Sequence, residues 1–111
     1  MTDHRELLEL AARAVGIALE QDFSDGVWKP LFYDDSLDRW KDWNPLEESG
    51  DSHDMCAALT ICTDWTKRCV ICVHRGTYIY EKFADHNNDR SAAWRLAALR
   101  VAAEIGKGVR G

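Results

Sequence analysis

The chain has 111 residues, of which 46% are hydrophobic and 30% are charged, and its formal net charge is −5. This length fits one domain covering residues 1–111, and five tryptophans with a large apolar fraction exclude a disordered chain. No apolar run approaches the roughly 20 residues that cross a bilayer, and the N-terminus lacks a secretory h-region, so we expect a cytoplasmic protein with reduced cysteines.

The charge is distributed unevenly along the chain. Residues 22–54 hold ten acidic and three basic side chains, whereas residues 55–111 hold five acidic and nine basic ones. The acidic middle would suit a basic partner surface, and the basic C-terminal third would suit a polyanion.

The first predicted element is an amphipathic helix from about Asp3 to Glu20. Its apolar face, with Leu7, Ala11 and Val15 among its members, follows the helical period and indicates core packing. The Asp25-Gly26 turn ends this region.

A strand is predicted from Val27 to Tyr33, where aromatic and branched residues dominate. Pro30 lacks an amide donor and therefore favours an edge strand. The pattern predicts a loop over residues 34–38 and leaves Trp40 and Trp43 between a short extended piece and a turn. A second helix is expected from about Ser52 to Ile61, after a break at Gly50 and with Asp51 as N-cap.

A β-hairpin is predicted from Arg68–His74 and Thr77–Phe83, joined by Arg75-Gly76 with the glycine supplying a positive φ. Pairing His74 with Thr77 divides the side chains between two faces, both largely apolar, so we expect at least one strand to be covered on both sides. One face holds Cys69, Ile71, Val73, Tyr78 and Tyr80, and the other holds Val70, Cys72, Ile79 and Phe83, interrupted by Glu81.

The last helix is expected to begin after a cap at residues 87–89, to run to about Ile105 and to stop at Gly106. It carries two apolar stripes on nearly opposite sides, which indicates a helix sandwiched between two layers or, alternatively, a homodimer seam. The element order is α-β-α-β-β-α. The sequence therefore predicts an α+β fold, in which helices pack on a small antiparallel sheet of about three strands.

The four cysteines invite a zinc interpretation, since Cys69 and Cys72 form a C-x-x-C pair and Cys56, Cys62, His53 and His74 are other candidate ligands. Val70 and Ile71 favour an extended strand instead, and there positions i and i+3 point to opposite faces. Buried free thiols are the preferred interpretation, and no metal or other cofactor is expected.

Two further groups of polar residues are candidate sites of chemistry. The carboxylates Asp34, Asp35, Asp38 and Asp42 lack the spacing of a calcium loop, and a solvated loop explains them better. His53 fits an exposed helix start, and no phosphate loop, nucleophile elbow or H-E-x-x-H helix is present. We therefore expect a protein that is not an enzyme, with a metal- or thiol-dependent enzyme as the weakest alternative.

A signature-like segment runs from Trp43 to Asp51, with Trp-Asn-Pro-Leu at residues 43–46 followed by Gly50-Asp51. With the final helix ending in Ala-Ala-x-Ile-Gly at residues 102–106, it resembles a group of small tailed-phage and prophage proteins of unknown function, similar in layout to the NinX-like proteins. The resemblance implies a phage accessory protein acting in the bacterial host cytosol. It supplies no catalytic residues.

The Trp-Asn-Pro-Leu turn has two interpretations: a core-anchored turn, or a rigid turn that presents side chains to a partner. The favoured function is binding of a host or phage protein, with inhibition of a host defence or DNA-handling factor as one version. The residues predicted to bind this partner form an acidic, tryptophan-containing surface: Trp40, Trp43, Glu47, Glu48, Asp34, Asp35 and Asp38.

The alternative function is nucleic-acid binding through the basic C-terminal third. Its phosphate contacts would come from Arg68, Arg75, Arg90, Arg95, Arg100, Lys107 and Arg110. A pI of about 5.3 and the spread of basic residues around the last helix argue against it.

Overall fold

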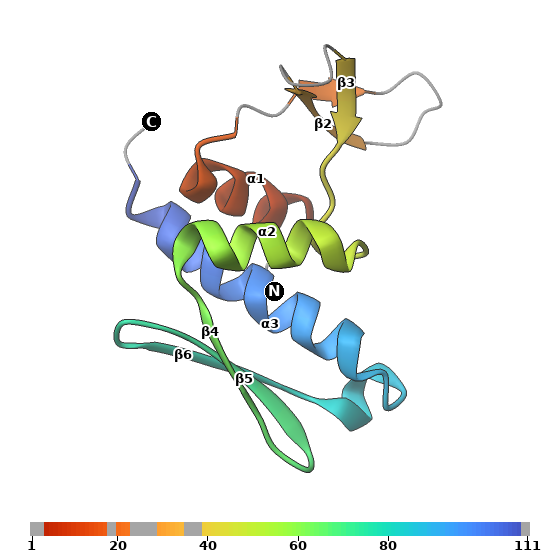
Figure 1. Cartoon of the computed structure of the whole chain (residues 1–111), viewed down its shortest axis with the longest axis vertical. Coiled ribbons are helices and arrows are strands. Elements are labelled where there is room, and N and C mark those ends of the chain that lie inside the picture. The colour runs from red at the N-terminus through yellow and green to blue at the C-terminus, as the bar shows by residue number, and fades with distance from the viewer. Residues whose placement is uncertain (1–3, 18–19, 23–28, 35–38, 110–111) are drawn as a thin grey trace.

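The computed structural model describes residues 4–17, 20–22, 29–34 and 39–109, with the backbone alone for residues 20–22, 29–34 and 39–41. The predicted α+β class, with a three-stranded antiparallel sheet packed by helices, is confirmed (Figure 1). The elements of the described part are α1 (His4–Val15), β1 (Glu20–Asp22), β2 (Lys29–Asp34), β3 (Arg39–Asp42), α2 (Ser49–Leu59), β4 (Cys62–Trp65), β5 (Cys69–His74), β6 (Thr77–Lys82), the 3₁₀ helix η1 (Phe83–His86) and α3 (Arg90–Lys107).

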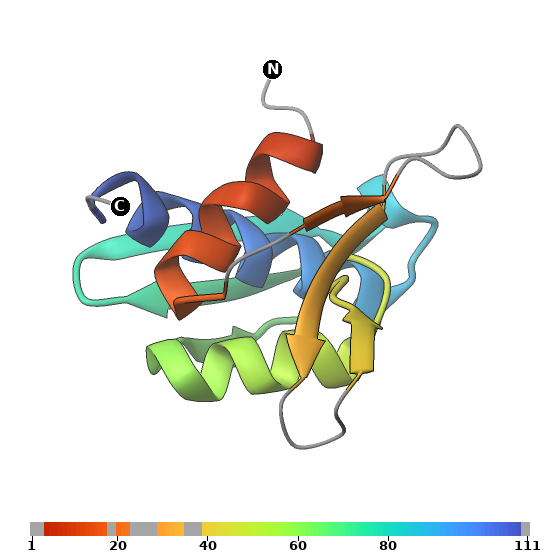
Figure 2. The same ribbon diagram turned by 90° about the horizontal axis from the view of Figure 1, so that it is seen from above.

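Helix α3 is the middle layer of the molecule. Helices α1 and α2 pack on one side of it, and the β4–β5–β6 sheet packs on the other (Figures 1 and 2). Both predicted apolar stripes are thus covered by the chain itself, and the sandwiched interpretation is confirmed. Leu99 and Val101 are fully buried, as are the alanines at positions 93, 97, 98 and 102.

The contact between α1 and α3 is made by small residues. Ala11 and Ala12 of α1 are almost completely buried, and Gly106 of α3 lies directly against the α1 backbone. A Cβ atom at Gly106 would stand 1.9 Å from the carbonyl oxygen of Leu10. Gly106 therefore lies inside α3, which continues to Lys107, and the prediction that it ends the helix is wrong.

The other helix ends also differ from the sequence-based boundaries. Helix α1 ends at Val15 because Gly16 takes a φ of 86° and donates to the carbonyl of Ala12 at 2.9 Å. Helix α2 begins earlier than expected, with Glu48 as its N-cap and Gly50 within its first turn. Asp51 is the third residue of α2 and not its cap, and its carboxylate accepts a hydrogen bond from the backbone N–H of Asn44.

The hairpin formed by β5 and β6 has the predicted register, with His74 opposite Thr77 and Val73 opposite Tyr78. The positive φ in its turn falls on Arg75, at 52°, and not on Gly76. Strand β4 pairs with the other edge of β5, so β5 is central. Helix α3 covers only one face, with Val70 and Cys72 fully buried, and the expectation of a strand covered on both sides is not met within the described residues.

A second antiparallel sheet has the order β1–β2–β3, which places β2 in the centre. The expectation that the Pro30 strand lies at an edge is therefore wrong. The pairing explains why proline is tolerated: β3 pairs only with residues from Leu31 onward, so Pro30 is paired on one side alone, with Gln21 of β1. The predicted strand positions 27 and 28 lie outside the described residues.

The substitution Gly106→Ala should destabilise the protein by about 2 kcal/mol or more, because the new methyl group would force α1 and α3 apart. Chemical denaturation followed by far-UV circular dichroism measures this loss. Gly50→Ala in α2 is the matched control, since no atom lies within 4 Å of the added Cβ and alanine is the better helix former. Equal stability of the two variants would contradict the close approach at Gly106.

Candidate functional site

The Trp43–Leu46 turn is anchored in the core. The side chain of Trp43 is 4% exposed, and Pro45 is fully buried. The core-anchored interpretation is therefore confirmed, and Trp43 is not available as a contact for a partner.

Hydrogen bonds from α2 and α3 hold this turn in place. Asp51 accepts from the backbone N–H of Asn44 at 3.0 Å, and the hydroxyl of Ser52, itself fully buried, donates to the carbonyl of Pro45. Arg95 of α3 donates to the carbonyl of Leu46 at 2.9 Å. The Trp43–Leu46 turn, which resembled a family signature in the sequence, thus has a structural role: its hydrogen bonds join it to α2 and α3.

The remaining residues of the predicted acidic surface are only partly described. Glu47 is exposed and exchanges hydrogen bonds with the side chain of Asn44, and Glu48 is exposed at the start of α2. Trp40 lies in β3 and Asp34 in β2, where the backbone alone is described, and Asp35 and Asp38 lie outside the described residues. Binding of a protein partner through these six residues stays a prediction.

The cysteine thiols do not converge. Cys72 points into the core and is fully buried, whereas Cys69, three residues before it on the same strand, belongs to the opposite face of the sheet. Within the described residues, no group of three or more histidine, cysteine or acidic side chains is placed to hold a metal ion. His53 is exposed on α2, as expected.

Two of the thiols are buried acids that stay protonated. Burial raises the pKa of Cys56 to about 12, and the neighbouring Cys72 adds to the rise. Burial also raises the pKa of Cys72 to about 11, although its contact with Thr63 works in the opposite direction. A nucleophilic or redox thiol needs a lowered pKa, so Cys56 and Cys72 act as core residues.

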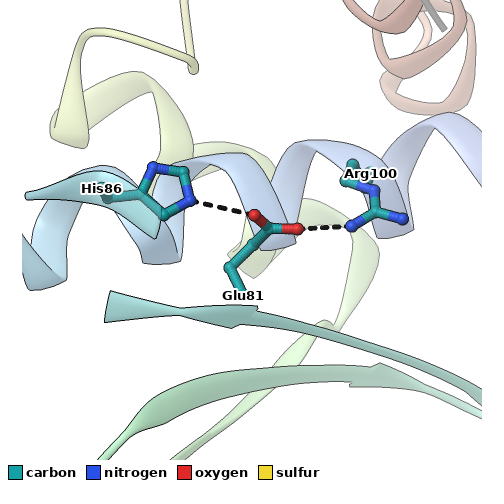
Figure 3. Close-up of polar contacts among 3 residues, drawn as sticks. All are labelled: Glu81, His86 and Arg100. Atoms are coloured by element: carbon teal, nitrogen blue, oxygen red, sulfur yellow. Dashed lines mark hydrogen bonds and ion pairs between the residues drawn. The ribbon is translucent and has the colours of Figure 1, made fainter. Parts of the chain in front are cut away.

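Glu81, which interrupts the inner face of the hairpin, is the centre of a polar cluster (Figure 3). Its carboxylate, 13% exposed, pairs with the guanidinium of Arg100 on α3 and lies 2.9 Å from Nε2 of His86. Both carboxylate oxygens are therefore occupied, and the cluster fastens β6 and η1 to α3 instead of offering a free base.

The outer face of the β4–β5–β6 sheet, turned away from α3, carries two of the exposed large apolar side chains of the described residues, the others being Trp65 and Val109. Tyr78 and Tyr80 are 71% and 59% exposed, and both side chains lie on the same face of β6. Ile71 and Val73 lie opposite them on β5 and are half-buried. Exposed apolar side chains gathered on one face are a feature of protein interaction sites, which makes this face a candidate.

One end of this face opens into a hollow of about 650 Å³ between the β4–β5 turn, the end of β6, η1 and the start of α3. Tyr80 and Phe83 supply its aromatic wall. No carboxylate is among the described residues that line it. Its four cations are Lys67, Arg68, Lys82 and Arg90.

The residues predicted to bind a partner did not include Tyr78, Tyr80, Lys67 or Lys82. The signal was present in the sequence, because Tyr78 and Tyr80 share one strand face and Lys82 follows two residues later. The grouping of cations was not readable, because it depends on how a turn, a strand end and a helix start meet in space.

The hydrogen bonds that hold the turn at residues 43–46 should be weakened by the loss of the Asp51 carboxylate. Asp51→Ala should destabilise the protein by about 1–3 kcal/mol, because a charge-assisted hydrogen bond to a backbone N–H is lost. Thermal unfolding compared with Asp54→Ala, an exposed carboxylate on the same helix, measures the difference. Equal melting temperatures would show that the carboxylate of Asp51 does not hold the turn.

The buried thiols should make the protein less stable in alkali. The folded state keeps Cys56 and Cys72 protonated while the unfolded state loses their protons from about pH 9 upward, so stability falls between about pH 9 and pH 12. At pH 10 the loss should be about 1 kcal/mol for each thiol. Denaturation at pH 8 and pH 10 checks this: Cys56→Ala should reduce the drop, and Cys62→Ser, at an exposed thiol, should leave it unchanged.

Comparison with known proteins gives no relative for this chain: no family model, no curated protein and no solved structure matches it. The resemblance to small phage proteins therefore stays a prediction. Among the helices in the described part of the chain, none has the length and apolar character needed to cross a membrane.

Proposed function

We propose that this protein binds single-stranded nucleic acid across the outer face of the β4–β5–β6 sheet, without catalysing a reaction. The observation that carries the proposal is the position of two exposed tyrosines beside a hollow lined by four cations that form no ion pair with any carboxylate of the described residues.

The tyrosines fit unpaired bases. Tyr78 and Tyr80 are two positions apart on one strand, so their Cα atoms lie about 7 Å apart along β6 and their side chains leave the same face. Base–aromatic stacking tolerates any sequence and requires bases that are free of a duplex. A double helix would offer these rings only its backbone, so a single strand is the better match.

The cations fit the phosphates. In the described part of the chain, no ion pair involves Lys67, Arg68 or Lys82, and Arg90 lies over the ring of Phe83, with its guanidinium carbon 5.1 Å from the ring centroid. No described ion pair therefore neutralises these four cations, although the carboxylates of Glu81 and Asp85 line a neighbouring hollow together with Lys82 and the two tyrosines. A protein partner with an acidic surface would meet the same charges, but it would not need two aromatic side chains on the same strand face.

The net charge of −5 does not oppose this assignment, because the acidic residues are concentrated in another part of the chain. Residues 55–111 carry four more bases than acids, that is nine against five. Because the sequence resembles small phage proteins, we further propose that the protein acts in the cytosol of an infected bacterium.

The test is fluorescence anisotropy with a labelled oligothymidylate of roughly 15 nucleotides, which is within the range that one small domain covers. Tyr78→Ala and Tyr80→Ala should each weaken binding about tenfold or more, whereas Tyr78→Phe and Tyr80→Phe, which keep the rings, should bind like the wild type. Affinity should fall with salt, with a log–log slope of about −3 for four phosphate contacts to a single strand.

Three outcomes would count against the proposal. One is no binding at low salt, and another is equal binding by the alanine and phenylalanine variants. The third is equal affinity for polyglutamate of similar charge, which would indicate an acidic protein as the partner.

A further inference from the structure

The geometry points to a second level of recognition within this surface: the cationic hollow receives a terminal phosphate monoester of the bound strand, so that the protein is a strand-end binder. This inference rests on the proposed function and names the part of the nucleic acid that the hollow takes.

The hollow concentrates positive charge from three separate elements. Lys67 and Arg68 come from the β4–β5 turn, Lys82 ends β6, and Arg90 begins α3. All four side chains are exposed to solvent. A volume of about 650 Å³ lies within the range of small-ligand sites and accommodates one terminal nucleotide.

The walls of the hollow are fixed before any ligand arrives. The side-chain hydroxyl of Thr66 accepts from the backbone N–H groups of Arg68 and Cys69, at 3.2 and 2.9 Å, which closes the turn. The backbone N–H of Phe83 donates to the carbonyl of Arg68 at 3.0 Å and joins this turn to η1. Such preorganisation reduces the entropy lost when a ligand binds.

Arg90 is held in place without being neutralised. Its guanidinium lies over Phe83, whose ring also stacks with Trp65 at a centroid distance of 6.2 Å. Stacking on a ring positions a guanidinium while its N–H groups remain able to donate to a phosphate.

The distribution of charge favours a strand end over an internal phosphodiester. A protein that tracks a backbone spreads its cations along a groove. Outside the hollow, the outer face carries the uncharged side chains of Tyr78, Ile71 and Val73. On β4 it carries the carboxylate of Asp64, a residue that stands opposite Ile71 in the sheet. A terminal monoester carries up to two negative charges near neutral pH and an internal diester carries one, so four cations at one end suit the terminus.

The experiment compares three oligothymidylates of equal length: one with a 5′-phosphate, one with a 3′-phosphate and one with hydroxyl groups at both ends. One phosphorylated form should bind about tenfold more tightly than the unphosphorylated form, and which one does so identifies the end. The preference should shrink below about pH 6, where the monoester loses its second charge.

Variants locate the effect. Lys67→Ala combined with Lys82→Ala should abolish the preference for the terminal phosphate while Tyr78 and Tyr80 still support binding. Arg75→Ala removes an exposed charge from the far turn of the same sheet and should leave the preference intact. Circular dichroism confirms that each variant is folded.

The outcomes separate the two proposals. Equal affinity for the three oligonucleotides, with the tyrosine effect retained, would overturn the strand-end inference and leave the proposed function standing. Binding of thymidine 5′-monophosphate, but not thymidine, by a protein that binds no oligonucleotide would support the hollow as a phosphate site and overturn the strand proposal. No binding of any of these probes would overturn both.

Discussion

The burial of α3 on both sides is the constraint on which the rest of the structure depends. On one side its small residues allow α1 to approach until Gly106 touches the backbone at Leu10, and on the other it covers Val70 and Cys72 of β5. A helix used in this way needs side chains that are apolar but small on the side facing another helix. The alanine-rich composition of α3 is thus a consequence of packing two helices and a sheet around one axis.

This arrangement also decides which surface is free. The sheet has one helical layer to pack against, so its inner face is occupied and fastened to α3 through Glu81 and Arg100 (Figure 3). No helix or strand of the described residues covers the outer face, which carries Tyr78 and Tyr80. The turn at residues 43–46 contributes on the opposite side, where Arg95 ties it to α3. The chain's most distinctive segment therefore stabilises the scaffold, and the binding surface that we propose lies on another part of the molecule.

Local patterns were sufficient for the three helices and the β5–β6 hairpin, but not for the short strands β1, β3 and β4 or for the places where the elements meet. The hairpin register, the two-sided character of α3 and the class of the fold follow from periodicity and turn residues, all of which act over a few positions. Gly106 looked like a helix end because a glycine stop and a glycine contact are identical in sequence. The same limit explains the hollow, since neither Lys67 nor Arg90 indicates on its own that the other lies nearby. Strand β4 was missed because its four residues, Cys-Thr-Asp-Trp, have little alternation.

The separation of charge within the molecule reconciles an acidic protein with the anionic ligand that we propose. The strands that carry Asp22, Asp34 and Asp42 lie at one end of the longest axis, and the β4–β5–β6 sheet lies towards the other end (Figure 1). That axis measures 41 Å, whereas charges in solution are screened beyond about 10 Å at roughly 0.1 M salt. A polyanion at the outer face is therefore governed by the nearby lysines and arginines and not by the sum over the whole chain. At low salt the screening length grows, and the acidic end would then orient an approaching strand towards the cationic hollow.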